Sequence, residues 1–481
     1  MNNLNFLQSE KFLDILDKID SFVWGVPLIV LIAAVGILLT VRLGFIQVTH
    51  LPKALKFMVQ NEEGGEGEVT SFGALCTALS ATIGTGNIVG VATAIASGGP
   101  GALFWMEVMA FFGMATKYTE GLLAIKYRSI DKDGKVLGGP FYYIEKGMGK
   151  SWKWLAVLFA IFGIGVGILG IGTITQVNGI TSAVNNFFDP NNAHVAFTSG
   201  GMSYTWATVI SGCAVALFTA LVIIGGIKRI SKVSEIIVPF MAILYVACGL
   251  LLILMNLPAI PGAIKLVVKG AFSPSAVYGG LAGVSVKTAI QMGVARGIFS
   301  NEAGLGSAPI AAATAKTKEP VRQGLVTMTG TFIDTIVVCT MTGLSIILTG
   351  SWEQAVDGTL KGAAVTTEAF TRGLPFNNSV CAFLLMICLI FFAFTTILGW
   401  DYYSESCLKY LVGDRKGVLM VYKILYIVAV LIGPYLTVSA VWTTADIFNG
   451  LMAVPNLIAL VSLSGVAAAE TRKYVREHKK K

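Results

Sequence analysis

Charged residues are scarce in this chain: they make up 13% of its 481 residues, whereas a soluble domain has about a quarter. Histidine is rarer still, and the chain has no HExxH motif, no evident nucleophile–base pair and no paired membrane aspartates. We therefore expect no enzymatic activity, and the isolated histidines argue against a zinc centre. The three histidines are His50, His194 and His478.

Cysteine pairing is also missing. None of the seven cysteines forms a CxxC pair, and each lies in or beside an apolar segment. We interpret them as small buried hydrophobic residues, and we expect neither a disulfide framework nor a metal site. The seven are Cys76, Cys213, Cys248, Cys339, Cys381, Cys388 and Cys407.

Apolar residues dominate what is present. They make up 55% of the chain, the mean hydropathy is +0.74, and the 54 glycines suit closely packed membrane helices. The apolar blocks reach the length of about 20 residues that a helix needs to cross a bilayer. We predict an all-α polytopic membrane protein without a cleaved signal peptide, because the first apolar run is long enough to remain as a membrane helix. The eleven predicted spans are 22–43, 70–97, 101–127, 154–186, 204–227, 233–256, 278–315, 321–349, 379–408, 418–438 and 441–469.

The basic residues lie mostly on one side of this topology. One set of alternate loops, ending with the C-terminal tail, holds 24 Lys and Arg, and the opposite set holds 6. Basic loops stay in the cytoplasm, so we predict a plasma-membrane protein with its N-terminus outside and its C-terminus in the cytoplasm. The net charge of +8 has the same explanation, and no soluble basic domain exists to bind nucleic acid.

Ten of the spans divide into two halves of five, and each half begins with a glycine-interrupted helix. Because five spans separate the two interrupted helices, the halves are inverted, and paired breaks of this kind are typical of secondary transporters. The interrupting sequences are SATIGTGNIVG at 80–90 and FSNEAGLGSAP at 299–309. The predicted organisation is a first helix with a flexible linker (1–69), two repeats (70–256 and 257–469) and a basic tail (470–481).

The first break centres on the five residues Ile83-Gly84-Thr85-Gly86-Asn87. Glycine disfavours a continuous helix, and freed backbone groups inside a bilayer must find partners. The N–H groups of the outer half-helix suit the carboxylate of an amino acid, and the carbonyls of the inner half-helix suit a sodium ion. The simpler alternative is that Gly84, Gly86 and Gly90 only let helices pack closely.

The second break offers polar side chains. Ser300 and Asn301 follow Phe299 and are candidates to bind the substrate or a cation. Arg296 and Glu302 are costly at membrane depth unless paired, so they either gate the pathway or serve as partners of freed backbone groups.

A third candidate feature is the pair Thr395 and Thr396 within span 379–408. Two hydroxyls beside free carbonyls would form a neutral sodium site if they faced the first break. The alternative, common for threonine in membrane helices, is that each hydroxyl bonds back to its own helix.

Two motifs identify a family that the chain resembles. GGPGALFWM at 98–106 resembles the signature of the alanine or glycine:cation symporter family, and GVARGIFSNEAGLGSAP at 293–309 is similar to its other hallmark. The resemblance covers nearly the whole chain. Glu107 departs from the family pattern, because many members have Trp at that position. This difference affects a local detail of packing or gating and not the family assignment.

The resemblance implies a leucine-transporter-like fold of the amino acid/polyamine/organocation superfamily, with an inverted five-helix repeat and one extra N-terminal helix. It also implies sodium-driven uptake of alanine, glycine or both, with sodium as the coupling ion. By similarity, the sodium ligands would be the carbonyls of Ser80, Ile83 and Phe392 and the hydroxyls of Thr395 and Thr396. The substrate site would comprise residues of both breaks and two further candidates for its wall: Thr82, Gly84, Thr85, Gly86, Asn87, Phe299, Ser300 and Asn301, with Gln176 and Trp400.

Two other transport classes remain to be weighed. An ion channel is usually an oligomer around a pore, whereas two asymmetric inverted halves in one chain fit a carrier better. A proton-coupled or broader-range amino-acid symporter of the same superfamily is the closer alternative, and it would need a titrating group in the membrane. Glu107, Glu302, Asp334 and Asp401 are the candidates.

Overall fold

The computed structural model describes residues 10–60, 62, 64–131, 134–199, 202–273, 285–436 and 438–478. The first residues of the predicted span 278–315, through 284, lie outside this described part, as do parts of the predicted loops 1–21 and 257–277.

Long apolar helices dominate the described residues, which confirms the all-α membrane class. Eight helical segments of this part are long and apolar enough to cross a membrane, and one further pair is bent by 51° at a short break. The eight are Phe12–Arg42, Lys150–Phe188, Trp206–Ile223, Gly226–Met255, Pro320–Leu348, Asn378–Val412, Lys416–Tyr435 and Thr443–His478. The bent pair is α6 (Ser71–Thr82) and η1–α7 (Gly86–Gly98).

Two further predicted spans are helical but are not among these segments, the first because it carries charged side chains and the second because each of its two helices is too short. They are α8 (Gly101–Tyr127) and the pair α16 (Val286–Asn301) and α17 (Ala308–Ala312). The α8 helix packs along both α16 and α18 (Pro320–Thr331), and its polar residues Thr116, Lys117, Thr119 and Glu120 are buried.

The remaining long helices follow the predicted order. They are α2 (Glu10–Val23), α3 (Val26–Arg42), α10 (Lys153–Leu169), α11 (Ile174–Phe188), α12 (Trp206–Ile223), α13 (Gly226–Met255), η5 (Phe332–Cys339), α19 (Thr340–Leu348), α22 (Asn378–Val412), α23 (Lys416–Ile432) and α24 (Val438–His478). The η5 segment is a wider π-helical stretch that joins α18 to α19.

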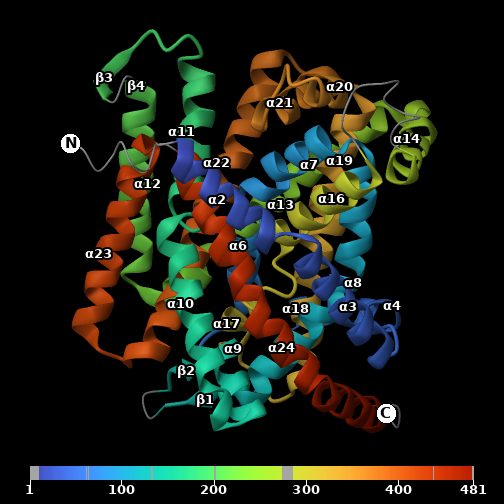
Figure 1. The fold of residues 1–481 in the computed structure, drawn as a ribbon, viewed down its shortest axis with the longest axis vertical. Coiled ribbons are helices and arrows are strands. Elements are labelled where there is room, and N and C mark those ends of the chain that lie inside the picture. The colour runs from blue at the N-terminus through green and yellow to red at the C-terminus, as the bar shows by residue number, and fades with distance from the viewer. Residues whose placement is uncertain are drawn as a thin grey trace.

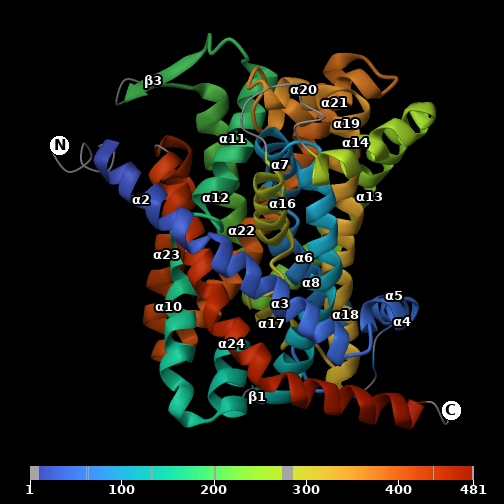
Figure 2. The same cartoon turned by 45° about the vertical axis from the view of Figure 1, so that its right-hand side comes forward.

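Short elements cover the two ends of the helix bundle (Figure 1). One end, here called the hairpin end, holds the antiparallel strands β3 (Val195–Ser199) and β4 (Met202–Thr205) with α20 (Ser351–Val356) and α21 (Ala363–Gly373). The opposite end, here called the tail end, holds β1 (Ser129–Ile130), β2 (Val136–Leu137), α9 (Pro140–Tyr142), η2 (Tyr143–Met148) and the C-terminus. Figure 2 shows α24 running from one end to the other.

Several predicted loops contain helices that periodicity alone did not indicate. The predicted loop 257–277 contains α14 (Ile260–Phe272), and α20 and α21 lie within the predicted loop 350–378. The predicted loop 1–21 contains most of α2, which is amphipathic. The loop 42–69 contains α4 (Ile46–Thr49) and α5 (Leu51–Val59).

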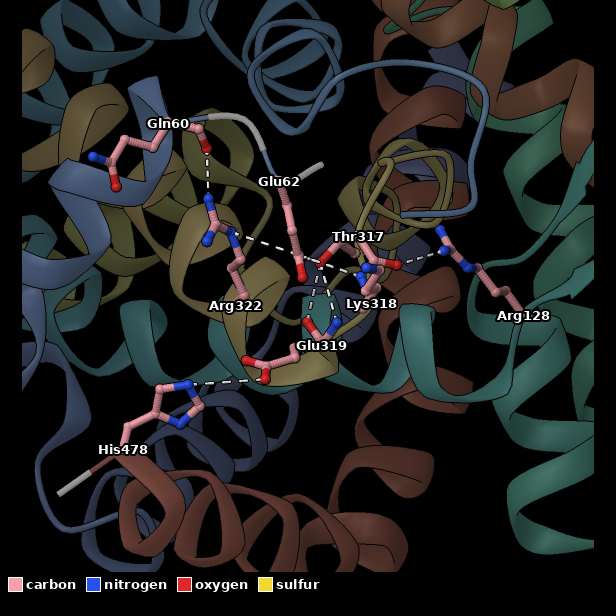
Figure 3. Close-up of polar contacts among 8 residues, drawn as sticks. All are labelled: Gln60, Glu62, Arg128, Thr317, Lys318, Glu319, Arg322 and His478. Atoms are coloured by element: carbon pink, nitrogen blue, oxygen red, sulfur yellow. Dashed lines mark hydrogen bonds and ion pairs between the residues drawn. The ribbon is translucent and has the colours of Figure 1, made fainter. Parts of the chain in front are cut away.

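The linker at 61–68 was expected to be flexible, but its described residues are held against the chain that follows α17. Glu68 N donates to Thr314 O at 2.8 Å, and Lys316 N donates to Val69 O at 2.8 Å. The Arg128 guanidinium donates to four carbonyls across this contact, including Glu66 O at 2.6 Å and Thr317 O at 3.1 Å. Figure 3 shows the polar contacts between the linker and the segment 317–322. The described part of the linker is therefore ordered by backbone hydrogen bonds to a segment distant in sequence, which amino-acid composition does not reveal.

Candidate substrate and cation site

The first break is a true interruption of the helix. The α6 helix ends at Thr82, Ile83 is extended (φ −75°, ψ 94°), and a π-helical turn resumes at Gly86. The N–H group of Gly84, freed by this break, donates to Asn87 Oδ1 at 2.9 Å. Asn87 Nδ2 in turn donates to Asp334 Oδ1 at 2.8 Å, so Asn87 fastens the break to η5.

Two glycines of this break lie in close contact with neighbouring helices. A Cβ added to Gly84 would lie 2.5 Å from Thr396 Oγ1, and one added to Gly86 would lie 3.3 Å from Phe299 Cδ1. Gly90, one turn further, faces open space within 4 Å. Close helix packing therefore does not explain Gly90. Gly84 does bring the backbone close to α22, and Gly86 brings it close to α16.

The second break contains three residues with left-handed backbone angles: Glu302 (φ 57°), Gly304 (φ 91°) and Gly306 (φ 85°). This conformation costs little for glycine and is uncommon for other residues. The two side chains just before it both contact η5. Ser300 Oγ donates to Asp334 Oδ2 at 2.9 Å, and Asn301 Nδ2 donates to Thr335 Oγ1 at 3.0 Å.

Asp334 therefore joins the two breaks. Its carboxylate is fully buried and accepts hydrogen bonds from Asn87 of the first break and from Ser300 of the second. Thr335 Oγ1 donates a further bond at 2.8 Å. From the sequence, Asp334 was only a candidate titrating group. That it is a lone carboxylate in an otherwise apolar span was the signal that could have indicated its structural role.

A second set of buried polar groups fixes the second break from the side of α8 and α24. Gly304 N donates to Glu120 Oε1 at 3.2 Å, and Asn456 Nδ2 donates both to Glu120 Oε1 at 2.7 Å and to Gly304 O at 2.9 Å. Ser307 Oγ donates to Glu302 Oε2 at 2.5 Å. Glu302 was considered either as a gate of the pathway or as a structural partner within the break. Its hydrogen bond with Ser307 favours the structural role.

The five predicted sodium ligands are all buried, and three of them meet. Thr396 Oγ1 lies 2.9 Å from Phe392 O and 3.4 Å from Ile83 O, so one hydroxyl connects a carbonyl of α22 with the carbonyl that ends α6. Ser80 O belongs to the last turn of α6, where carbonyls have no partner within the helix. The donors here are neutral oxygens, which suit a hard monovalent cation.

Thr395 is placed differently. Its hydroxyl donates to Phe391 O or Phe392 O, at 3.0 and 3.1 Å, and lies 3.6 Å from Met241 Sδ of α13. Both threonines therefore bond back to their own helix, as the alternative interpretation expected. Nearby, the backbones of α6 and α22 touch: a Cβ on Gly399 would lie 2.7 Å from Ala81 N.

A third interruption, which was not predicted, lies inside the predicted span 154–186; the segment Lys150–Phe188 is long enough to cross the membrane, but it is not continuously helical. The α10 helix ends at Leu169, Gly170 (φ −172°, ψ −80°) and Thr173 (φ −130°, ψ −83°) depart from helical geometry, and α11 begins at Ile174. The Tyr426 hydroxyl lies 2.8 Å from Gly172 O and 2.7 Å from Ile397 O, and so provides a partner inside the break. The Gly170-Ile171-Gly172 run was the signal that sequence reasoning missed.

This third break positions two predicted substrate residues. Gln176 lies in the first turn of α11, and its Oε1 accepts a hydrogen bond from Thr85 N at 3.4 Å. Trp400 is buried beside the break, where a Cβ on Gly172 would lie 2.6 Å from Trp400 Cβ. Thr82 Oγ1 bonds back to Ala78 O and Leu79 O of its own helix.

A cavity of about 200 Å³ lies directly against the first break. Its lining residues are Thr85, Gly86, Val89, Gly90, Thr93, Arg296 and Phe299. Phe299 thus lines the cavity, as expected of a wall residue, and Trp400 does not. A larger cavity of about 540 Å³ lies at the tail end, lined in part by Glu68, Lys135, Glu405 and Asp414.

Comparison with known proteins decides the family. A model of the sodium:alanine symporter family matches residues 9–481. The chain belongs to this family. It is 48% identical, over 96% of its length and 97% of the relative, to the sodium/alanine symporter AgcS of Methanococcus maripaludis. It is 54% identical to an uncharacterized transporter of Haemophilus influenzae, covering 97% of the chain and 96% of the relative.

A further relative and one solved structure complete the comparison. The chain is 38% identical, over 97% of its length and 93% of the relative, to the putative sodium/proton-dependent alanine carrier protein YrbD of Bacillus subtilis. The crystal structure of MhsT in complex with L-phenylalanine superposes with a TM-score of 0.56 at 14% identity, covering 85% of this chain and 98% of that one. The fold expected from the sodium:alanine symporter family motifs is therefore confirmed, and the chain is a transporter, not an enzyme.

Proposed function

We propose that this protein is a secondary active symporter that couples inward sodium movement to uptake of alanine or glycine by alternating access. The observation that carries the proposal is the adjacency of the two candidate sites. The carbonyl of Ile83 is one of the proposed sodium ligands, and the next residue, Gly84, begins the segment that would meet the substrate carboxylate. One stretch of backbone thus serves both ligands.

This adjacency supplies a physical route for coupling. A sodium ion bound by Ile83 O and Thr396 Oγ1 would fix the extended conformation of Ile83, and with it the position of the backbone at residues 84–86, which borders the proposed substrate site. Because coupling free energies are reciprocal, bound substrate would raise the affinity for sodium by the same factor. Ser80, Phe392 and Thr395 complete the proposed cation site.

The proposed substrate site lies between the breaks. It comprises the backbone of Gly84, Thr85 and Gly86, the side chain of Gln176 beside Thr85, and Phe299 at the wall. Asn87, Ser300 and Asn301 hold the two breaks to η5 and so fix their spacing. A cavity of about 200 Å³ has room for alanine or glycine, which offer few apolar atoms.

The proposed placement is the plasma membrane, with the hairpin end outside and the tail end in the cytoplasm. The supporting observation is the charge of the loops, with basic residues concentrated at the tail end. Each of the two proposed repeats, 70–256 and 257–469, begins with one broken helix, in keeping with the inverted arrangement.

Uptake of radiolabelled alanine into proteoliposomes tests the proposal. An inward sodium gradient should drive accumulation, a potassium gradient of equal size should not, and unlabelled glycine should compete. Accumulation that follows a pH gradient without sodium would instead establish the proton-coupled alternative. The measurement with a pH gradient is included because Asp401 is a candidate proton-binding group: both oxygens of its buried carboxylate have no hydrogen-bond partner among the described residues.

A further inference from the structure

A second cavity lies beyond the first on the side of the N-terminal helix. It has a volume of about 120 Å³, and its lining includes Asp20 of α2, Trp24 directly after that helix, Asp446 of α24, and Arg296 and Phe299 of α16. Arg296 and Phe299 also line the cavity at the first break. These two side chains therefore separate the cavity at the proposed substrate site from the one beside α2.

The charges around this partition are complementary. Arg296 Nη1 lies 3.7 Å from Asp446 Oδ2, and the guanidinium carbon lies 5.8 Å from the centre of the Phe299 ring. Arg296 Nε and Asp20 Oδ1 are both buried, and neither has a hydrogen-bond partner among the described residues. A cation and a carboxylate that line one small cavity, each with an unused polar atom, are placed to interact after a small movement.

Asp20 and Asp446 belong to one structural unit. Trp24 Nε1 donates to Asp446 O at 2.9 Å, and Thr443 Oγ1 donates to Asp17 Oδ1 at 3.3 Å, so α2 is fastened to the first turns of α24. The two carboxylates thus lie on the α2–α24 side of the cavity, and the guanidinium lies on the α16 side.

We propose that Asp20 is a third member of an outer gate, in which Arg296 is held over the substrate cavity by Asp446 and by this carboxylate of the additional N-terminal helix. With the gate closed, the guanidinium compensates both carboxylates. When α16 moves away from the α2–α24 unit, the two carboxylates lose that partner and face each other, so like charges disfavour the open state. Asp20 is a positioning residue in this scheme, because it acts through Arg296.

The inference rests on the proposed transport role of the cavity but not on the identity of the substrate, so its test uses accessibility. Thr93 lines the inner cavity, and a Thr93→Cys variant reports passage of the gate. We would measure its reaction with a membrane-impermeant thiol reagent in right-side-out vesicles, without amino acid. The reaction rate should rise several-fold when Asp20→Asn is added, as it should with Asp446→Asn. The Asp20→Glu variant, which keeps the charge, should restore the slow rate.

Asp17→Asn is the matched control, since Asp17 is on the same helix and contacts α24 but does not line the cavity. An equal rise with Asp17→Asn would show that docking of α2, and not the Asp20 charge, restricts access. An unchanged rate with Asp20→Asn, while Asp446→Asn raises it, would remove Asp20 from the gate. A Thr198→Cys variant on β3 reports the orientation, and if it reacts only in inverted vesicles the comparison is made there.

Discussion

The side-chain amide of Asn456 donates hydrogen bonds to both the Glu120 carboxylate and the carbonyl of Gly304. This one group on α24 therefore links α8 to the irregular backbone of the second break. Because all three groups are buried, no solvent replaces the bonds if the amide is removed.

We expect Asn456→Ala to destabilise the protein by about 1–3 kcal/mol, because it leaves a buried carbonyl without its donor and removes a donor from a buried carboxylate. Uptake should fall with stability, since Gly304 is free to leave its left-handed conformation. Thermal unfolding in detergent measures the effect. Ser462→Ala on the same helix removes an exposed hydroxyl and should change little. Equal unfolding temperatures for the two variants would contradict the bracing role.

The two threonines of α22 should contribute unequally to sodium dependence. Thr396 Oγ1 contacts Ile83 O across the first break, whereas Thr395 contacts its own helix and Met241. Thr396→Ala should therefore raise the sodium concentration for half-maximal uptake more than Thr395→Ala does, and the double variant should lose most sodium-driven uptake. Thr367→Ala on α21 is the control. Unchanged sodium dependence in the double variant would refute the cation assignment.

Methyl groups added at the first break should abolish transport without preventing expression. At Gly84 the added Cβ meets the Thr396 hydroxyl at 2.5 Å, and at Gly86 it meets Phe299 and the Cα of Ser300 at 3.3 and 3.4 Å. The second contact includes backbone, which yields less easily than a side chain. Binding of labelled alanine to purified Gly84→Ala and Gly86→Ala proteins measures the loss. Gly465→Ala, which faces open space, should bind normally.

The size limit on the substrate should depend on Phe299 and not on Trp400. Every amino acid presents the same polar head, so a site for alanine rejects leucine by steric clash alone. Phe299→Ala enlarges the cavity and should let valine compete with alanine, whereas Trp400→Ala should mainly lower stability, because its ring packs away from the cavity. Competition against labelled alanine tests both. Strong inhibition by leucine in the unmodified protein would indicate a broad-range carrier.

Local composition was enough to predict part of this architecture. Long apolar blocks marked the spans, and the glycines of 80–90 and 299–309 marked two breaks because the cost of glycine in a helix is a local property. The break at Gly170–Thr173 went unpredicted, since the surrounding residues are as apolar as any continuous span.

Partners distant in sequence could not be predicted. Asp334 meets Asn87 across 247 positions, and Asn456 meets Glu120 across 336, so nothing local specifies either pair. Trp400 illustrates the same difficulty within one helix, because which residues of α22 face the cavity depends on how α22 is rotated against α10 and α6. The helix packing, which the sequence does not display, sets that rotation.

The touching backbones at Ala81 and Gly399 constrain how the carrier moves. With no side chain between them, α6 and α22 already lie at their closest approach. Ala81 is next to Ser80 and two residues from Ile83, and Gly399 is about one helical turn from Thr395 and Thr396, so the contact lies beside the oxygens proposed to hold sodium. Neither helix has room to slide past the other without a clash of main-chain atoms. We therefore expect this point to act as a pivot, about which the inner half of α6 tilts while the spacing of the cation's ligands stays nearly constant until the tilt itself releases the ion.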